Sequence, residues 1–170
     1  GSEIVVRFPK KEDIDDMHKY INELSREDSF LTVLGKKITK KEETEFFHKT
    51  VAAIEKGDTL HFAVLVNGVY AGNCEIERRT EHRVRHIGVL GISLAATHRE
   101  GGIGTELFRF LIEEGKKMGL KMLQLSCFEN NPRALHIYEK LGFIRAGTIP
   151  RAIKYKDGYV GEVIMYLPLA

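Results

Sequence analysis

Apolar residues recur along this chain in two rhythms, one typical of strands and one typical of helices. Helical spacing begins after Pro9 and again after Thr39, where Thr39 and Glu42 form the pattern of a capping box. Short apolar runs between turn residues predict strands, and Asn67-Gly68 and Asp157-Gly158 predict tight hairpin turns. The predicted strands cover residues 3–8, 60–66, 69–77, 84–94, 122–128, 143–155 and 159–167, and the predicted helices 11–25, 39–57, 105–118 and 131–142.

The order of these elements predicts one α/β (α+β) domain. The strands at 60–66, 69–77 and 84–94 follow one another directly and are expected to be antiparallel, whereas the helix at 105–118 connects two strands that can be parallel. We therefore expect a central mixed, mostly antiparallel sheet of six to seven strands flanked by helices. The 170 residues, 43% of them hydrophobic, suit a single domain with its own core. Gly1-Ser2 resembles the remnant of a removed tag, so the domain is taken as residues 3–170.

A glycine-rich segment, Arg99-Glu100-Gly101-Gly102-Ile103-Gly104, lies between a predicted strand and a predicted helix. Unpaired N–H groups and the positive end of the helix dipole make such a turn a site for a phosphate. Glycine lets the backbone approach the anion closely, and Arg99 can add a charged contact. We expect this loop to bind a phosphorylated ligand; the alternative is that its glycines only permit a tight turn.

Two common nucleotide-binding motifs do not fit this loop. A phosphate-binding loop of NTPases needs a lysine after its last glycine, but Thr105 follows Gly104. A dinucleotide fingerprint needs a third glycine or alanine at the position of Leu107. It also needs an acidic residue about 20 residues further on, where this chain has Gln124. Both classes of nucleotide-binding protein are therefore excluded.

A second segment, from Asn131 to Phe143, has the spacing N-x-x-A-x-x-x-Y-x-x-x-G-F. Together with R-x-x-G-x-G at residues 99–104, this pattern resembles the GCN5-related N-acetyltransferase (GNAT) superfamily over nearly the whole chain. The resemblance implies transfer of an acetyl group from acetyl-CoA to a primary amine by direct attack in a ternary complex. It further implies that the following residues contact the cofactor: Ile92, Ser93, Leu94, Arg99, Glu100, Gly101, Gly102, Ile103, Gly104, Thr105, Asn131 and Tyr138.

The resemblance places Tyr138 beside the thioester sulfur. A phenol with a pKa of about 10 stays protonated at neutral pH, so Tyr138 is predicted to be the general acid that protonates the departing thiolate. The alternative is a tyrosine that only packs in the core. Many relatives carry a glutamate midway along the fourth strand, but residues 88–90 contain no acid. Glu75 and His86, on neighbouring predicted strands, are therefore the candidates for the general base, acting directly or through water.

The acceptor is expected to be a small-molecule amine, an amino acid or a peptide N-terminus. An α-amine is favoured over a lysine-like amine because it loses its proton more easily, which suits a weak base. The resemblance implies that acceptors meet residues 29–32 and 155–159, and it is compatible with a homodimer. A non-catalytic acyl-CoA-binding or regulatory module of the same fold is the alternative, and a structural domain without a cofactor is a third interpretation.

Charge and composition bound the remaining possibilities. The 26 basic and 24 acidic residues leave a net charge of +2, which does not favour a nucleic-acid partner. With no apolar run of membrane-spanning length and no signal pattern, we expect no membrane association and a cytoplasmic location. Cys74 and Cys127 lie in strand patterns and are expected to be buried thiols. His82 and His86 would lie about 13 Å apart on a strand, so no metal is expected.

Overall fold

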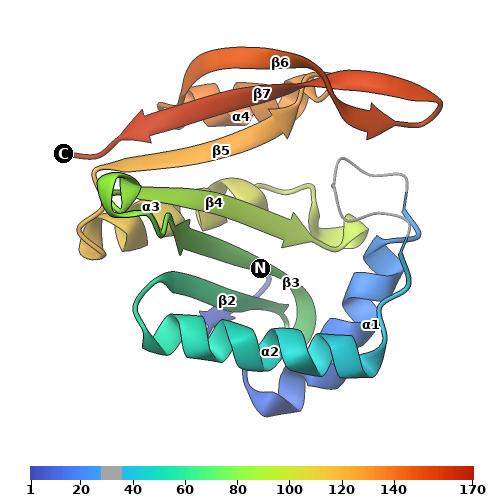
Figure 1. Ribbon diagram of the computed structural model, residues 1–170. Coiled ribbons are helices and arrows are strands. Elements are labelled where there is room, and N and C mark those ends of the chain that lie inside the picture. The colour runs from blue at the N-terminus through green and yellow to red at the C-terminus, as the bar shows by residue number, and fades with distance from the viewer. Residues whose placement is uncertain (28–35) are drawn as a thin grey trace.

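The computed structural model describes residues 1–27 and 36–170. They build one seven-stranded sheet in the order β1-β2-β3-β4-β5-β7-β6 (Figure 1). Only β4 and β5 are parallel, and all other neighbouring strands are antiparallel, which confirms the predicted mixed sheet. The strands are β1 (Ile4–Arg7), β2 (Thr59–Val66), β3 (Val69–Arg78), β4 (Ile87–Leu94), β5 (Met122–Phe128), β6 (Ile144–Tyr155) and β7 (Gly158–Pro168).

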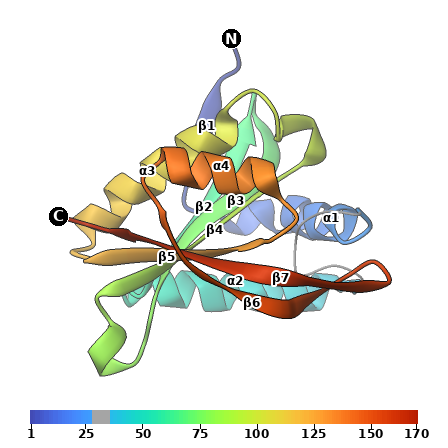
Figure 2. The same cartoon turned by 90° about the horizontal axis from the view of Figure 1, so that it is seen from above.

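The helices cover both faces of the sheet, α1 and α2 on one face and α3 and α4 on the other (Figure 2). Their bounds are α1 (Ile14–Leu24), α2 (Lys40–Glu55), α3 (Ile103–Lys117) and α4 (Pro132–Lys140). None of the helices in the described part of the chain is long and apolar enough to cross a membrane. Each face of the sheet is therefore covered by its own pair of helices.

Local sequence signals fix the starts of two helices. At α2, Thr39 Oγ1 accepts a hydrogen bond from Glu42 N at 3.2 Å, and Glu42 Oε2 accepts one from Thr39 N at 2.8 Å. This is the predicted capping box, which satisfies two backbone donors that a helix start leaves free. At α4, Asn131 Oδ1 accepts from Ala134 N at 3.3 Å, and Pro132 occupies the first helical position.

Most predicted bounds differ from the observed ones by a few residues, and two of these differences move a turn. The fourth strand does not begin at Val84 but at Ile87, because a 3-10 turn at His82–Val84 precedes it. The carbonyl of His86 accepts hydrogen bonds from Lys121 N and Met122 N, which holds this residue in the turn and not on the strand. The second hairpin turns at residues 156–157, since Gly158 already pairs with Tyr155.

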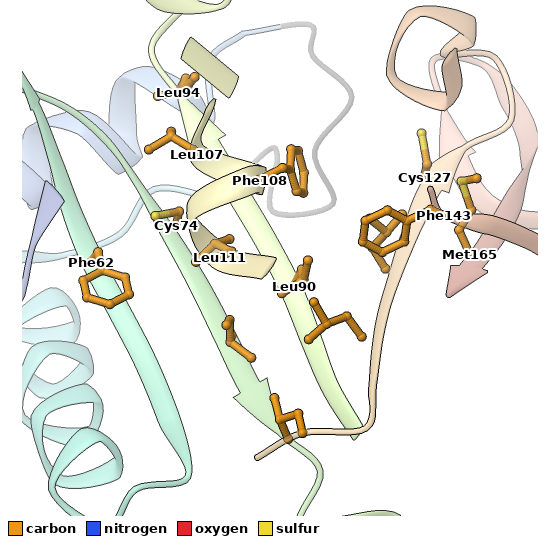
Figure 3. Packing of buried hydrophobic residues seen from close by; sticks show 14 of the residues in the cluster. Phe62, Cys74, Leu90, Leu94, Leu107, Phe108, Leu111, Cys127, Phe143 and Met165 are labelled. Carbon is orange, nitrogen blue, oxygen red and sulfur yellow. The ribbon is translucent and has the colours of Figure 1, made fainter. Parts of the chain in front are cut away.

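The main core lies between the sheet and α3. Leu111 of α3, Ile76, Leu123, Val163 and Met165 are all fully buried there. Figure 3 shows side chains of α3 beside residues of β3 and β4. Burying one such side chain contributes about 1.5–3 kcal/mol. Two free thiols, of Cys74 and Cys127, belong to this core, as predicted, and burial raises the pKa of the Cys74 thiol to about 12 and that of Cys127 to about 11.

Gly72 of β3 lies so close to β4 that no other residue fits. A Cβ at this position would lie 2.1 Å from the Ser93 carbonyl oxygen, and its φ of +153° is rarely adopted by residues with a side chain. The close contact occurs where β3 pairs with the end of β4, at Gly72 opposite Leu94. Gly72 therefore allows the backbone of β3 to approach the last residues of β4 closely.

Replacing Gly72 by Ala is expected to lower the free energy of unfolding by at least about 2 kcal/mol, because the added methyl group overlaps backbone atoms. Chemical denaturation measures this change. Gly147→Ala is the matched control, since a Cβ there meets no atom within 4 Å and φ is not positive. We expect the control to change stability by less than about 0.5 kcal/mol. Equal effects of the two substitutions would contradict the proposed close contact.

Candidate active site

The sheet opens between β4 and β5. These parallel strands pair only over three positions, from Ile87 opposite Met122 to Val89 opposite Gln124. β4 continues to Leu94 and β5 to Phe128, so their later residues are not paired with each other. The edge of β4 at Ile92–Leu94 is thus left with backbone groups that can bind an extended ligand, as the resemblance implies.

A cavity of about 770 Å³ occupies this opening. On the face covered by α3 and α4 it is lined by Phe108, Asn131 and Tyr138, and on the opposite face by Tyr20 and Phe46 of α1 and α2. The cavity therefore connects the two faces of the sheet. Two reactants could enter from opposite sides and meet between the strands.

The glycine loop forms a tight turn between the end of β4 and the start of α3. Gly101 and Gly102 have φ angles of +95° and +84°, with open space where a Cβ would be. Gly102 is the N-cap of α3, and the first helical hydrogen bond runs from Glu106 N to Gly102 O. The helix therefore leaves the N–H groups of residues 103–105 free to bind an anion. Such a group of N–H donors can bind a phosphate.

Arg99 and Glu100 hold the glycine loop in place. The Arg99 side chain donates from Nε to Leu94 O at 3.0 Å and forms an ion pair with Glu27. Glu100 accepts a hydrogen bond from Arg133 of α4 at 3.3 Å. These contacts tie the loop to the end of β4, to the end of α1 and to α4, so both side chains are engaged within the protein.

Tyr138 lies at the wall of the cavity with its ring packed between aromatic neighbours. Its ring centroid lies 5.0 Å from that of Phe108 and 6.2 Å from that of Phe143, in edge-on arrangements. Burial raises the pKa of the Tyr138 phenol above its ordinary value of 10.0. The phenol consequently stays protonated over a wider pH range, as a proton donor must. Asn131 lines the same cavity while its side chain caps α4.

Glu75 of β3 is the candidate base that lines the cavity. It lies directly opposite Gly91 of β4, and a Cβ at Gly91 would lie 2.9 Å from Glu75 Oε1. The missing side chain on β4 therefore leaves room for a carboxylate that comes from the neighbouring strand. The Glu75 side chain is 39% exposed, which leaves it accessible to a reactant.

His61 of β2 is a site residue that the sequence analysis missed. Its Nδ1 lies 3.2 Å from Glu75 Oε2, while its Nε2 is buried and has no hydrogen-bond partner in the described structure. The ring is only 3% exposed and contacts Phe46 edge-on. Because His61 and Glu75 share one sheet face only after β2 and β3 pair, spacing along the chain gave no signal for this contact.

The structure does not bring all predicted site residues to the cavity. His86 is exposed in the turn before β4, roughly 20 Å along the chain from Ile92, so it does not reach the opening. Ser93 does line the cavity, and its hydroxyl forms a hydrogen bond with the hydroxyl of Tyr20. Residues 29–32, expected to meet the acceptor, lie outside the described residues. The β6–β7 hairpin contributes Ile153 and Glu162, not residues 155–159.

The charged residues of the cavity are mostly acidic. Among the described residues that line it, five are glutamates and one is a lysine: Glu42, Glu43, Glu75, Glu77, Glu162 and Lys36. Lys36 forms an ion pair with Glu42 at 3.3 Å. In the part of the chain that is described, no cluster of His, Cys, Asp or Glu side chains could hold a metal ion. The cavity therefore suits a cationic reactant.

A mixed sheet that opens between two parallel strands, with a glycine turn at the following helix, is the arrangement that the GNAT resemblance implies. The family model of the Acetyltransferase (GNAT) family matches residues 18–143. The chain therefore belongs to the GNAT acetyltransferase family, and it is an acetyl-CoA-dependent N-acetyltransferase.

The chain is also similar to individual proteins in sequence or in fold. The chain is 28% identical over 122 residues to the ribosomal protein bS18-alanine N-acetyltransferase of Escherichia coli, covering 72% of this chain and 80% of that protein. A GNAT-family acetyltransferase from Streptococcus pneumoniae has a TM-score of 0.87 and 27% identity, covering 98% and 100% of the two chains. The spermidine N-acetyltransferase of Vibrio cholerae, in complex with CoA and spermine, has a TM-score of 0.80 and 20% identity, covering 97% and 95%.

Replacing His61 by Leu is expected to change the free energy of unfolding by less than about 1 kcal/mol. The substitution removes one hydrogen bond, worth about 0.5–1.5 kcal/mol, but it also removes a buried nitrogen that has no partner. Urea denaturation measures the difference. A loss of more than about 3 kcal/mol would contradict this estimate and show that the His61 ring is needed to hold the fold together.

Proposed function

We propose that this enzyme acetylates the amine of a peptide N-terminus, an amino acid or another small molecule, by direct attack in a ternary complex. The observation that carries the proposal is the cavity through the sheet, which has Glu75 on one face and Tyr138 on the other. A base and an acid on opposite sides of an acetyl group are what aminolysis of a thioester requires. The relative from Escherichia coli, named for acetylating an alanine of a ribosomal protein, supports an α-amine acceptor.

In this proposal the carrier binds along the α3 and α4 face. The N–H groups of residues 103–105 would hold its diphosphate, and the free edge of β4 at Ile92–Leu94 would pair with its pantetheine arm. Bound acetyl-CoA supplies an activated acetyl group. Backbone N–H groups at the edge of β4 would polarise the acetyl carbonyl.

Proton transfer is assigned to two side chains. Glu75 would take a proton from the amine at Oε1, the oxygen that lies over Gly91, while Oε2 remains bound to His61. Tyr138 would give its phenolic proton to the departing sulfur. In this proposal the base comes from β3, whereas many relatives carry a glutamate on the fourth strand.

An α-amine remains the favoured acceptor. At about pH 7 its deprotonation costs ~1.1 kcal/mol, against ~4.6 kcal/mol for a lysine-like amine. A single carboxylate in contact with solvent is a weak base. The difference of roughly 3.5 kcal/mol should therefore make acetylation of a lysine-like amine slower than that of an α-amine. The preference would be overturned if lysine side chains or polyamines were acetylated fastest at a fixed pH.

Substitution of the two proposed proton carriers tests the mechanism. Glu75→Gln keeps an oxygen for the bond to His61 but removes the base, and Tyr138→Phe removes the acid; each is expected to lower kcat by about 100-fold. Release of coenzyme A thiol with alaninamide as acceptor measures the rate. Tyr166→Phe on β7, outside the cavity lining, is the control and should retain the activity of the unmodified enzyme.

The proposed acid also predicts how kcat changes with pH. Because burial raises the pKa of Tyr138, its acidic form persists to higher pH, and kcat should not decline up to about pH 10. Unchanged turnover in Tyr138→Phe, with the same pH profile, would remove the general-acid role.

The glycine loop can be tested apart from catalysis. Gly104→Asp puts a carboxylate in the first turn of α3, where a negative charge stabilises the helix and a Cβ meets only Leu94, at 4.0 Å. We expect unchanged or raised thermal stability but a Kd for coenzyme A increased about 30-fold or more, because the carboxylate competes with the diphosphate. Gly104→Asn adds a side chain of nearly the same size without the charge, so it should weaken coenzyme A binding less than Gly104→Asp does. Unchanged affinity in Gly104→Asp would contradict diphosphate binding at this loop.

A further inference from the structure

Glu43 of α2 is a buried carboxylate that faces the cavity and takes no part in the proposed proton transfer. Its side chain lines the cavity although the residue is only 7% exposed. Within the described residues, the carboxylate forms neither a hydrogen bond nor an ion pair. Its neighbour Glu42, in contrast, completes the capping box and pairs with Lys36. The capping box at the start of α2 therefore does not use the Glu43 carboxylate.

An unpaired carboxylate is unfavourable in such a place. Burial raises the pKa of Glu43, and the nearby imidazoles of His18 and His61 only partly oppose this effect. A carboxylate that is largely removed from water usually has a partner, because its loss of hydration is unfavourable. A ligand that brings a positive charge to Glu43 would supply the missing partner.

The surroundings of Glu43 indicate that the positively charged ligand is the acceptor. His61 lies near both carboxylates, since its Nδ1 lies 3.2 Å from Glu75 Oε2 and its imidazole is one of the groups that act on the pKa of Glu43. Glu43 therefore lies on the same face of the sheet as the proposed base, where the acceptor amine must enter. Glu77 and Glu162 add negative charge to the same cavity, and the lone lysine among the described lining residues is already paired.

We propose that Glu43 forms a second cation-binding site, which selects acceptors carrying a positive charge close to the amine that is acetylated. This inference rests on the proposed function and narrows it. Of the acceptors considered above, a peptide N-terminus followed by a basic residue fits the site. A free amino acid does not, because its carboxylate would enter a cavity lined by glutamates.

Three dipeptide amides with the same α-amine test the inference: Ala-Arg-amide, Ala-citrulline-amide and Ala-Glu-amide. Arginine and citrulline have nearly the same shape, but only arginine is charged, and neither side chain offers a second amine for acetylation. Calorimetric binding to the protein saturated with coenzyme A gives Kd, and thiol release gives kcat/KM. We expect Ala-Arg-amide to bind about tenfold more tightly than Ala-citrulline-amide and Ala-Glu-amide to bind most weakly.

Variants on one helix assign the effect to Glu43. In Glu43→Gln, which preserves the size of the side chain, the preference for arginine over citrulline should fall from about tenfold to less than about threefold. Glu45→Gln is the matched control, since Glu45 is exposed on the same helix and does not line the cavity. It should retain the full preference. Thermal unfolding with and without coenzyme A verifies that both variants are folded.

Each result has a clear meaning. Equal affinity for the arginine and citrulline peptides, or an unchanged preference in Glu43→Gln, would overturn the second cation site while leaving acetyl transfer to α-amines intact. Charge-selective binding that Glu43→Gln abolishes, without any acetylation, would support the site and contradict the proposed function. The binding measurement therefore separates the two failures.

Discussion

The parting of β4 from β5 is the constraint on which the rest of this molecule depends. Two parallel strands joined through α3 pair over three positions and then separate, although both continue for several residues. Backbone N–H and C=O groups at an unpaired strand edge need partners, so the opening is stable only where water or a ligand can reach it. The helices on each face and the glycine turn at the start of α3 are arranged around this opening (Figure 1). The cavity occupies the opening.

The opening also explains how the chemistry is distributed over the two faces. Side chains alternate along β3, so Cys74 and Ile76 pack toward α3 while Glu75 lies on the face of α1 and α2. Tyr138 reaches the same cavity from α4, on the other side. Gly91 belongs to this arrangement, because the absence of its side chain leaves space for the Glu75 carboxylate. The carboxylate that many relatives supply from the fourth strand can thus come from the adjacent strand.

The polar groups buried around the cavity lower the free energy of unfolding, and the packing of the apolar core compensates for this loss. Glu43 and His61 Nε2 lack partners in the described structure, whereas the hydroxyls of Tyr20 and Ser93 bond to each other. Fully buried side chains such as Leu111 and Leu123, each worth about 1.5–3 kcal/mol, lie on the opposite face of the sheet. Separation of an apolar core from a polar cavity by one sheet lets unpaired groups remain available to reactants without disturbing the packing beneath α3.

The sequence by itself determined the elements, the helix caps at Thr39 and Asn131 and the glycine turn, since these depend on neighbouring residues and on local periodicity. It also indicated the family, through two motifs about thirty residues apart. Only the tertiary structure decided which candidate base reaches the cavity: Glu75 does, and His86 does not. The contact of His61 with Glu75, and the burial of Glu43 against them, depend on strand pairing and on how α2 packs. Such contacts join residues distant in the chain, and no local pattern encodes the register that brings them together.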